Sequence, residues 1–265
     1  DVPYPPNYGG AIGMYYRIKA LHALGYKIIL HSFEYGRGKQ QELANICEKV
    51  FYYSRKSGIS SHFSTRPYIV QSRINPVLNL RLKEDNYPIW LEGLHCCGIL
   101  EENDLKDRAV FVRMHNIEQD YYSALAQQSS GWKRAFFLLE SKKIAKYESI
   151  LAHATAIFAI QSKDVSYFKK LNQETFLLPA AFPLTEMENY ETKDYHLFHG
   201  NLSVPENEQA AIWIIKNVIQ HLPEETFVIA GKDPSDKLKT LVQSFPNMKL
   251  FENPRDSEMN RLIGE

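Results

Sequence analysis

The chain has 265 residues, 44% of them hydrophobic, which is enough for two α/β domains with ordinary cores. Its 31 basic and 31 acidic side chains give a formal net charge of zero, which disfavours a nucleic-acid-binding protein, because such proteins usually carry a basic excess. No stretch approaches the roughly 18 consecutive apolar residues of a spanning helix, and the opening DVPYPP lacks the features of a signal peptide. The sequence therefore favours a cytoplasmic protein.

Short apolar runs alternate with helical stretches along the first two thirds of the chain. Strands that alternate with helices predict a mostly parallel sheet covered on both faces. The runs predict strands at residues 26–33, 49–53, 88–91, 109–115, 154–160 and 175–181. The stretches between them predict helices at residues 13–24, 67–82, 116–128, 132–152 and 163–171, with Ser162 as the cap of the last one.

The alternation restarts after a polar run at residues 190–194. The second part predicts strands at 195–202, 226–230 and 248–251, with helices at 206–221, 235–245 and 257–263. We therefore predict an α/β, GT-B-like architecture in which a doubly wound parallel-sheet domain precedes part of a second Rossmann-like domain. The expected parts are a first domain over 1–182 that lacks its first strand, a linker over 183–194, and a partial domain over 195–265. A glycine-bearing loop opens the chain and a helical pattern ends it, so we expect a fragment cut at both ends.

Common catalytic signatures and cysteine frameworks are absent from the sequence. Cys47, Cys96 and Cys97 are an odd number with one adjacent pair and no CxxC or Cys/His ligand spacing. We expect reduced, packed thiols and no metal site. No GxSxG, HExxH or GxxxxGK[ST] motif occurs either.

The first candidate motif is PYPPNYGG, at residues 3–10. Gly9 and Gly10 permit positive φ and the close approach of another molecule, and a helix expected from near Gly13 would direct free amides at an anion. The alternative is a tight turn between a strand and a helix. The glycine spacing differs from GxGxxG, so dinucleotide binding is only weakly supported.

The second candidate is the end of the apolar run AVFVRMHNIEQ. Ligands of open parallel sheets bind beyond the carboxyl ends of strands, and His115 stands where this strand should finish. A histidine there can hydrogen-bond a substrate hydroxyl or transfer a proton. A structural explanation is enough for two neighbours, because Asn116 can cap the following helix and Glu118 can stabilise its first turn. Arg113 is expected to face a helix or to pair with a carboxylate.

Two further features each admit two explanations. The helix WKRAFFLLESKKIAKY combines aromatic and basic residues, which is typical of a core helix with a solvated basic side and also of a helix that contacts a membrane surface. A peripheral membrane contact on the cytoplasmic side would use Trp132, Lys133, Arg134, Phe136 and Phe137. The turns FHGNLSVP and FVIAGKDP offer backbone amides and the charge of Lys232 to a diphosphate, or are simple strand-to-helix turns.

Segments from both halves of the chain carry a family resemblance. They are PYPPNYGG with GYKIILHSF, then RMHNIEQDYYSALA, YESILAHATAIFAIQSKDVSYFKKL, and finally LFHGNLSVPENEQAAIWIIKNV with FVIAGKDP. In this order they resemble the retaining, GT-B-fold glycosyltransferases of the group 1 and family 4 type. The resemblance implies transfer of a sugar from a nucleotide-diphosphate donor to a carbohydrate or lipid-linked acceptor, with retention. It also implies no cofactor or metal, and a role in bacterial polysaccharide or glycoconjugate biosynthesis.

The resemblance also implies roles for particular residues. His115 would contact the transferred sugar as the catalytic residue, and Gly9 and Gly10 would lie against the donor phosphates or the acceptor. Asn116 joins them as a binding residue, while the donor side would be lined by Gly200, Asn201 and Lys232. Many relatives have an arginine where Asn201 stands and a lysine near Pro205-Glu206. The family's glutamate pair, seven residues apart, is expected beyond residue 265, so this chain alone is expected to be inactive.

Two other hypotheses stay open. A sugar epimerase or phosphorylase would keep the fold, but an epimerase would need a carboxylate cluster that the sequence does not reveal. A non-catalytic two-lobed binding protein would need a secretory leader upstream of Asp1.

Overall fold

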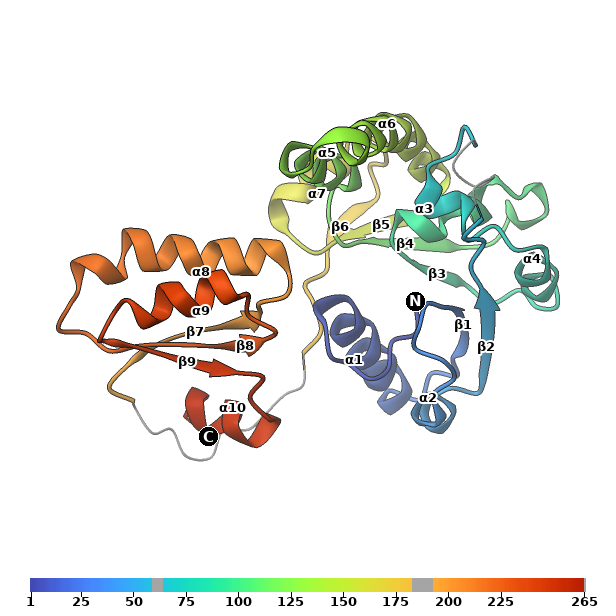
Figure 1. Ribbon diagram of the computed structural model, residues 1–265. Coiled ribbons are helices and arrows are strands. Elements are labelled where there is room, and N and C mark those ends of the chain that lie inside the picture. Colours follow the sequence, from blue (N-terminus) through green and yellow to red (C-terminus); the bar gives the residue numbers. More distant parts are fainter. Residues whose placement is uncertain (59–63, 183–192, 265) are drawn as a thin grey trace. The chain divides into compact units, whose positions relative to one another are not determined.

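The computed structural model describes residues 1–58, 64–182 and 193–264, which divide into two units (Figure 1). Unit 1 spans Asp1–Pro183 and unit 2 spans Leu184–Glu265. Of the expected linker at 183–194, only Lys193 and Asp194 belong to the described residues. Every described strand pair is parallel, which confirms the predicted α/β class. Among the described residues, no helix has the length and apolar character needed to cross a membrane.

The strands of unit 1 form two parallel sheets. In the first, β1 (Ile29–Glu34) pairs with β2 (Lys49–Ser54). The second has the order β3-β4-β5-β6, with the bounds Ile89–Glu92, Val110–Met114, Ala156–Ala159 and Thr175–Leu177. Residues of both sheets share one hydrophobic core, to which β1 gives Phe33, β2 gives Tyr53 and β4 gives Val112. All six strands were predicted, with boundaries shifted by a few residues.

Helices cover both faces of the β3–β6 sheet. Figure 1 shows α1 (Gly9–Ala23) on one face, and α5 (Glu118–Gln128), α6 (Gly131–Tyr147) and α7 (Ser162–Phe168) on the other. Helix α7 begins at Ser162 with Gln161 at its cap position, so the prediction of Ser162 as the cap is wrong by one residue. The remaining helices are α2 (Gln41–Ile46), α3 (Tyr68–Gln71), α4 (Pro76–Leu82) and the 3-10 helices η2 (Leu94–Glu101), η3 (Asn103–Leu105) and η4 (Glu148–His153).

The predicted helix at residues 67–82 is interrupted. The side chain of Asn75 accepts hydrogen bonds from the backbone amides of Val77 and Leu78, and Pro76 occupies the first helical position. An asparagine cap followed by proline begins a helix, and proline also disfavours helical conformation in the residue before it. The chain therefore begins α4 at Pro76 as a separate helix, after α3 has ended at Gln71.

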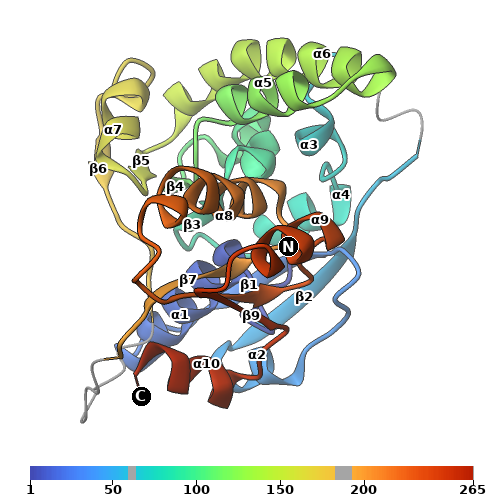
Figure 2. The same cartoon turned by 60° about the vertical axis from the view of Figure 1, so that its left-hand side comes forward.

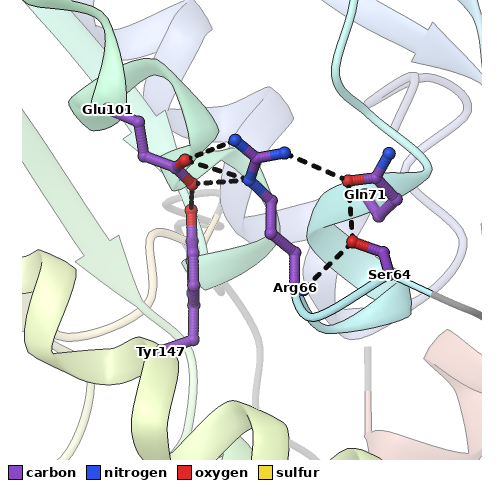
Figure 3. Close-up of polar contacts among 5 residues, drawn as sticks. All are labelled: Ser64, Arg66, Gln71, Glu101 and Tyr147. Carbon is purple, nitrogen blue, oxygen red and sulfur yellow. Dashed lines mark hydrogen bonds and ion pairs between the residues drawn. The ribbon is translucent and has the colours of Figure 1, made fainter.

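A polar cluster holds the end of α6 against the rest of unit 1 (Figure 3). The Arg66 guanidinium donates to the Glu101 carboxylate, with Nε–Oε2 2.9 Å and Nη2–Oε2 2.6 Å, and the Tyr147 hydroxyl donates to Oε1 at 2.6 Å. Burial opposes the ionisation of Glu101, but the bonds from Arg66 and Tyr147 outweigh it and lower its pKa. The cluster joins η2 and the segment before α3 to α6.

Unit 2 is a three-stranded parallel sheet between helices. The strands are β7 (His196–Asn201), β8 (Phe227–Lys232) and β9 (Met248–Glu252), in that order. Helices α8 (Pro205–Asn217) and α9 (Asp236–Gln243) lie on one face and α10 (Asp256–Ile263) on the other (Figure 2), with η5 (Ile219–His221) after α8. Alternate residues of β8 pack toward the two sides, Phe227 and Ile229 toward α8 and α9, Val228 and Ala230 toward α10. This alternation is what a central strand requires.

Gly231 is the residue of unit 2 least able to accept a side chain. A Cβ there would lie 2.0 Å from the Gly200 carbonyl oxygen and 2.9 Å from Leu202 Cγ. We expect Gly231→Ala to lower the free energy of unfolding by about 3 kcal/mol, because the neighbouring strand must move. Urea denaturation measures this. Gly200→Ala is the matched control, since its Cβ would meet nothing closer than 3.6 Å, and an equal loss in both variants would contradict the packing argument.

Candidate functional site

Two polar side chains meet at the carboxyl ends of adjacent strands. Glu92 is the last residue of β3, and His115 directly follows β4. The strands pair in parallel with Glu92 opposite Arg113, so the two side chains leave the sheet side by side. His115 Nε2 lies 3.0 Å from Glu92 Oε2. The predicted strand end is thus observed, and it carries a carboxylate–imidazole pair.

The Glu92 carboxylate is held by three donors. Besides His115, the Trp90 indole Nε1 donates to Oε1 at 2.8 Å, and Arg17 of α1 forms an ion pair with the same oxygen. The Glu92 side chain is only 20% exposed, and this burial opposes ionisation. The hydrogen bond from His115 and the charge of Arg17 outweigh burial, so the pKa of Glu92 lies below its ordinary value. Glu92 is therefore a fixed anion.

The other side of the His115 ring is available to a ligand. The side chain is 26% exposed, and Nδ1 has no hydrogen-bond partner among the described residues. When Nε2–H donates a hydrogen bond to the Glu92 carboxylate, the neutral ring presents an acceptor lone pair at Nδ1. An imidazole oriented in this way can accept a hydrogen bond, or the proton itself, from a substrate hydroxyl.

Glu118 is a second ionisable group beside the pair. It lies in the first turn of α5, as the sequence predicts, but its environment is not that of a surface helix end. Burial raises the pKa of Glu118 to about 7. The negative charge of Glu148 adds to this rise, and the positive charges of His115 and Arg73 oppose it. Its carboxyl group can therefore give or take a proton near neutral pH.

The raised pKa of Glu118 predicts a pH-dependent stability. The folded state holds this proton more tightly than the unfolded state, so the free energy of unfolding should fall as the pH rises from about 4.5 through about 7. We expect Glu118→Gln to remove this part of the decline, as urea denaturation at pH 5 and pH 7.5 would show. Glu206→Gln, in the exposed first turn of α8, is the control. An unchanged decline in Glu118→Gln would contradict the assignment.

Asn116 and Arg113 differ in part from their predicted roles. Helix α5 has Ile117 at its cap position, so the prediction that Asn116 caps it is wrong, because the helix starts one residue later. Arg113 does face the α1 side of the sheet, yet it forms no hydrogen bond to a carboxylate among the described residues. Its Nη2 donates to the Pro179 carbonyl at 3.0 Å, while Nε and Nη1 lack described partners. Burial, reinforced by the charge of Arg17, lowers the pKa of Arg113 to about 10.

Gly9 and Gly10 occupy the first turn of α1 rather than a loop before it. The helix begins at Gly9 and not near Gly13, so the predicted helix start is wrong by four residues, and neither glycine adopts the positive φ that its lack of a side chain permits. Tyr8 sets the helix start, since its extended backbone is at the cap position. A Cβ on Gly10 would lie 3.0 Å from the Tyr8 ring, whereas one on Gly9 would meet nothing within 4 Å. The first-turn amides of α1 have no side-chain cap.

A cavity of about 310 Å³ opens beyond the carboxyl ends of β1 and β2. Its wall combines an aromatic face with charge, because the Arg55 guanidinium lies 4.5 Å from the centre of the Tyr35 ring. Aromatic faces together with polar hydrogen-bonding groups are the usual chemistry of a small-molecule site. The lining residues are Glu34, Tyr35, Gly36, Ser54, Arg55, Ser57 and Tyr68.

In unit 2, Gly200, Asn201 and Lys232 lie at the carboxyl ends of β7 and β8. Asn201 is opposite Lys232 in the register, as Gly200 is opposite Gly231. Asn201 Oδ1 accepts hydrogen bonds from the Ser203 amide at 3.1 Å and hydroxyl at 2.7 Å, which explains it as a turn residue. Lys232 is exposed and has no ion-pair partner among the described residues. The described residues include no group of His, Cys, Asp and Glu suited to hold a metal ion.

Comparisons with known proteins agree with this architecture. No protein-family model matches the chain. An "Uncharacterized 44.6 kDa protein in cps region" of Klebsiella pneumoniae is 28% identical over 293 residues, an alignment that covers 99% of this chain and 72% of that protein. Among solved structures, UGT89C1 of Arabidopsis thaliana complexed with UDP-L-rhamnose matches with a TM-score of 0.53 at 10% identity, covering 95% of this chain and 69% of that one. LpCGTa in complex with UDP matches with a TM-score of 0.51 at 10% identity, covering 95% and 70%.

These likenesses define the class of fold. The chain has the α/β fold with parallel sheets found in GT-B glycosyltransferase structures. At this identity the likeness concerns the fold alone, so the chemistry must be argued from the residues described above.

Proposed function

We propose that the protein is a glycosyltransferase that moves a sugar from a nucleotide-diphosphate donor to an acceptor hydroxyl. The observation that carries the proposal is the Glu92–His115 pair at the carboxyl ends of two adjacent strands, in which Nδ1 of His115 has no partner in the described part of the chain. Ligands of open α/β sheets bind at this edge. Support comes from the solved structures of the same fold, whose names record UDP-L-rhamnose and UDP.

Residues of each unit, taken separately, have a role in this proposal. His115 contacts the transferred sugar or the acceptor hydroxyl, and the uncapped amides at Gly9 and Gly10 contact phosphate or acceptor. Lys232, with the turn after Gly200 and Asn201, stabilises the charge that develops on the leaving diphosphate. The cavity at β1 and β2 takes part of the carbohydrate or lipid-linked acceptor. The chain then acts by positioning and charge stabilisation, without a metal.

The stereochemical course has two candidates. The ordered sequence segments favour retention, in which the leaving phosphate helps to deprotonate the acceptor on the same face of the sugar. The Glu92–His115 pair is also compatible with inversion, because an oriented imidazole can act as a general base on the acceptor hydroxyl in a direct displacement. We propose retention, and the anomeric coupling in the proton NMR spectrum of the first-formed product distinguishes the two. A role in bacterial polysaccharide or glycoconjugate biosynthesis in the cytoplasm belongs to the same proposal, and the Klebsiella pneumoniae relative supports its bacterial part.

The test uses the protein expressed from its complete gene. It is incubated with a panel of nucleotide sugars, with and without EDTA, and release of the nucleoside diphosphate is followed. We expect release with one donor class, accelerated by the correct acceptor and insensitive to EDTA. Binding of a nucleotide sugar without any turnover, under all acceptor conditions, would favour a binding protein instead. Reversible conversion of the donor's sugar, without release of the nucleoside diphosphate, would favour an epimerase.

A further inference from the structure

One stripe of α6 is exposed and partly apolar. Trp132, Leu139 and Lys146 recur every seven residues, so they lie along one line of the helix. Trp132 is 76% exposed and Leu139 53%, and the neighbouring Leu138 is 44% exposed. Figures 1 and 2 show α6 beside α5 along the edge of unit 1. Single exposed apolar residues are ordinary, but three large ones on one helix face mark an interaction surface.

The charge on α6 itself is one-sided. Residues 131–147 contain five basic residues and one acidic residue, Glu140, although the whole chain has a formal net charge of zero. Glu140 is buried and paired with Lys143, so it does not offset the exposed charges. The exposed polar side chains of α6 are all basic, namely Lys133, Arg134, Lys142 and Lys146. None of these four has an ion-pair partner among the described residues.

The fold uses the opposite side of α6. Phe137 packs edge-on against Tyr122 of α5 with ring centroids 5.9 Å apart, and Phe136 packs against Phe137. Glu140 accepts a hydrogen bond from the Tyr68 amide at 2.5 Å, and Tyr147 bonds to Glu101 (Figure 3). Phe136 and Phe137 are half-buried, whereas Leu138 and Leu139 are exposed. The two leucines therefore fit a membrane contact better than the two phenylalanines that the sequence predicted for it.

We propose that Trp132, Leu138 and Leu139, with Arg134, Lys142 and Lys146 around them, form a docking surface for the anionic headgroups of a membrane. This set is called the α6 surface below. Charge complementarity selects the occupant, because exposed basic side chains around exposed tryptophan and leucine match negatively charged lipid. The apolar side chains enter the headgroup boundary, while the lysine stems lie along it and keep their ammonium groups at the phosphates. The protein then works beside a lipid surface.

The test is flotation of the full chain with vesicles of stated composition. We expect binding to phosphatidylcholine vesicles that contain about 30% phosphatidylglycerol, and none to phosphatidylcholine alone. Binding should weaken in about 0.5 M salt. Lys142→Glu/Lys146→Glu and, separately, Trp132→Ala/Leu139→Ala should each weaken binding at least about tenfold. Lys169→Glu/Lys170→Glu makes the same charge change at an exposed pair after α7, and should bind like the wild type.

Three vesicle-binding results would overturn the proposal. They are no binding to the anionic vesicles, equal binding to neutral ones, and an equal loss in the Lys169/Lys170 control. A chain that dimerises in size-exclusion chromatography, and becomes monomeric on Trp132→Ala/Leu139→Ala, would assign the α6 surface to contact between copies. Circular dichroism confirms that each variant is folded. The readout is vesicle binding, so it is independent of any sugar transfer.

Discussion

Replacing His115 with alanine is expected to lower kcat/KM for sugar transfer about a hundredfold. The ring is one quarter exposed at the carboxyl end of β4, with Nε2 bound to Glu92 and Nδ1 open to a ligand. Alanine removes this acceptor, while Glu92 keeps its bonds to Arg17 and Trp90. The loss should therefore arise from the reaction and not from unfolding. Initial rates of nucleoside diphosphate release with the complete protein measure it, together with the melting temperature.

The chain contains a matched control for this variant. His196 Nε2 lies 3.2 Å from Glu225 Oε2 in unit 2, so it forms the same kind of pair, but both side chains are more than half exposed. His196→Ala should leave transfer unchanged within about twofold. If His115→Ala also stayed within about twofold, which corresponds to roughly 0.4 kcal/mol of barrier, the assignment of His115 would be wrong.

The sequence predicts the strands of this fold well because their signal is local. Runs such as residues 109–115 are short, apolar and rich in β-branched or aromatic residues, and each became a strand within a few positions. The segment Leu94–Glu101, LHCCGILE, is also apolar but has neither a strand nor a clear helical period, and its 3-10 conformation was not predicted. The break at Asn75-Pro76 did have a local signal, since an asparagine cap followed by proline is a helix start.

The site is only half predictable in this way. His115 was found because a histidine follows a buried strand, and Glu92 ends the run PIWLE by the same rule, so that signal was available and missed. Which strands are neighbours depends on tertiary pairing, however, and no local pattern places Glu92 beside His115. The contact of Arg17 with Glu92 joins residues 75 positions apart. Likewise, the burial that raises the pKa of Glu118 to about 7 comes from the folded surroundings.

The second large effect is expected from Glu92→Gln, which should lower kcat/KM about thirtyfold. The amide keeps the shape of the side chain but no longer supplies a charged acceptor to His115 Nε2, so the ring loses its fixed orientation and tautomer. Glu92 acts through His115 and is a positioning residue, so we expect the loss in kcat more than in KM. Glu225→Gln, which weakens the matched pair in unit 2, should have no effect on transfer.

Stability must be measured alongside, because Arg17 loses its carboxylate partner in Glu92→Gln. The pKa of Glu92 is lowered in the folded state, so its ionised form stabilises the protein above its ordinary pKa, and this contribution is lost as the pH falls. Glu92→Gln should be less stable at neutral pH and lose this part of the acid sensitivity. A variant whose stability and acid sensitivity matched the wild type would show that the Arg17–Glu92 ion pair does not form in solution.

A double-mutant cycle decides whether Glu92 and His115 act as a unit. If the carboxylate works only by orienting the imidazole, Glu92→Gln should cost little further activity once His115 is alanine. The double variant would then be about as slow as His115→Ala alone, about a hundredfold below wild type and not several thousandfold. Additive losses would mean that Glu92 contributes through Arg17 or directly to the substrate, and the pair would no longer explain the chemistry of this site.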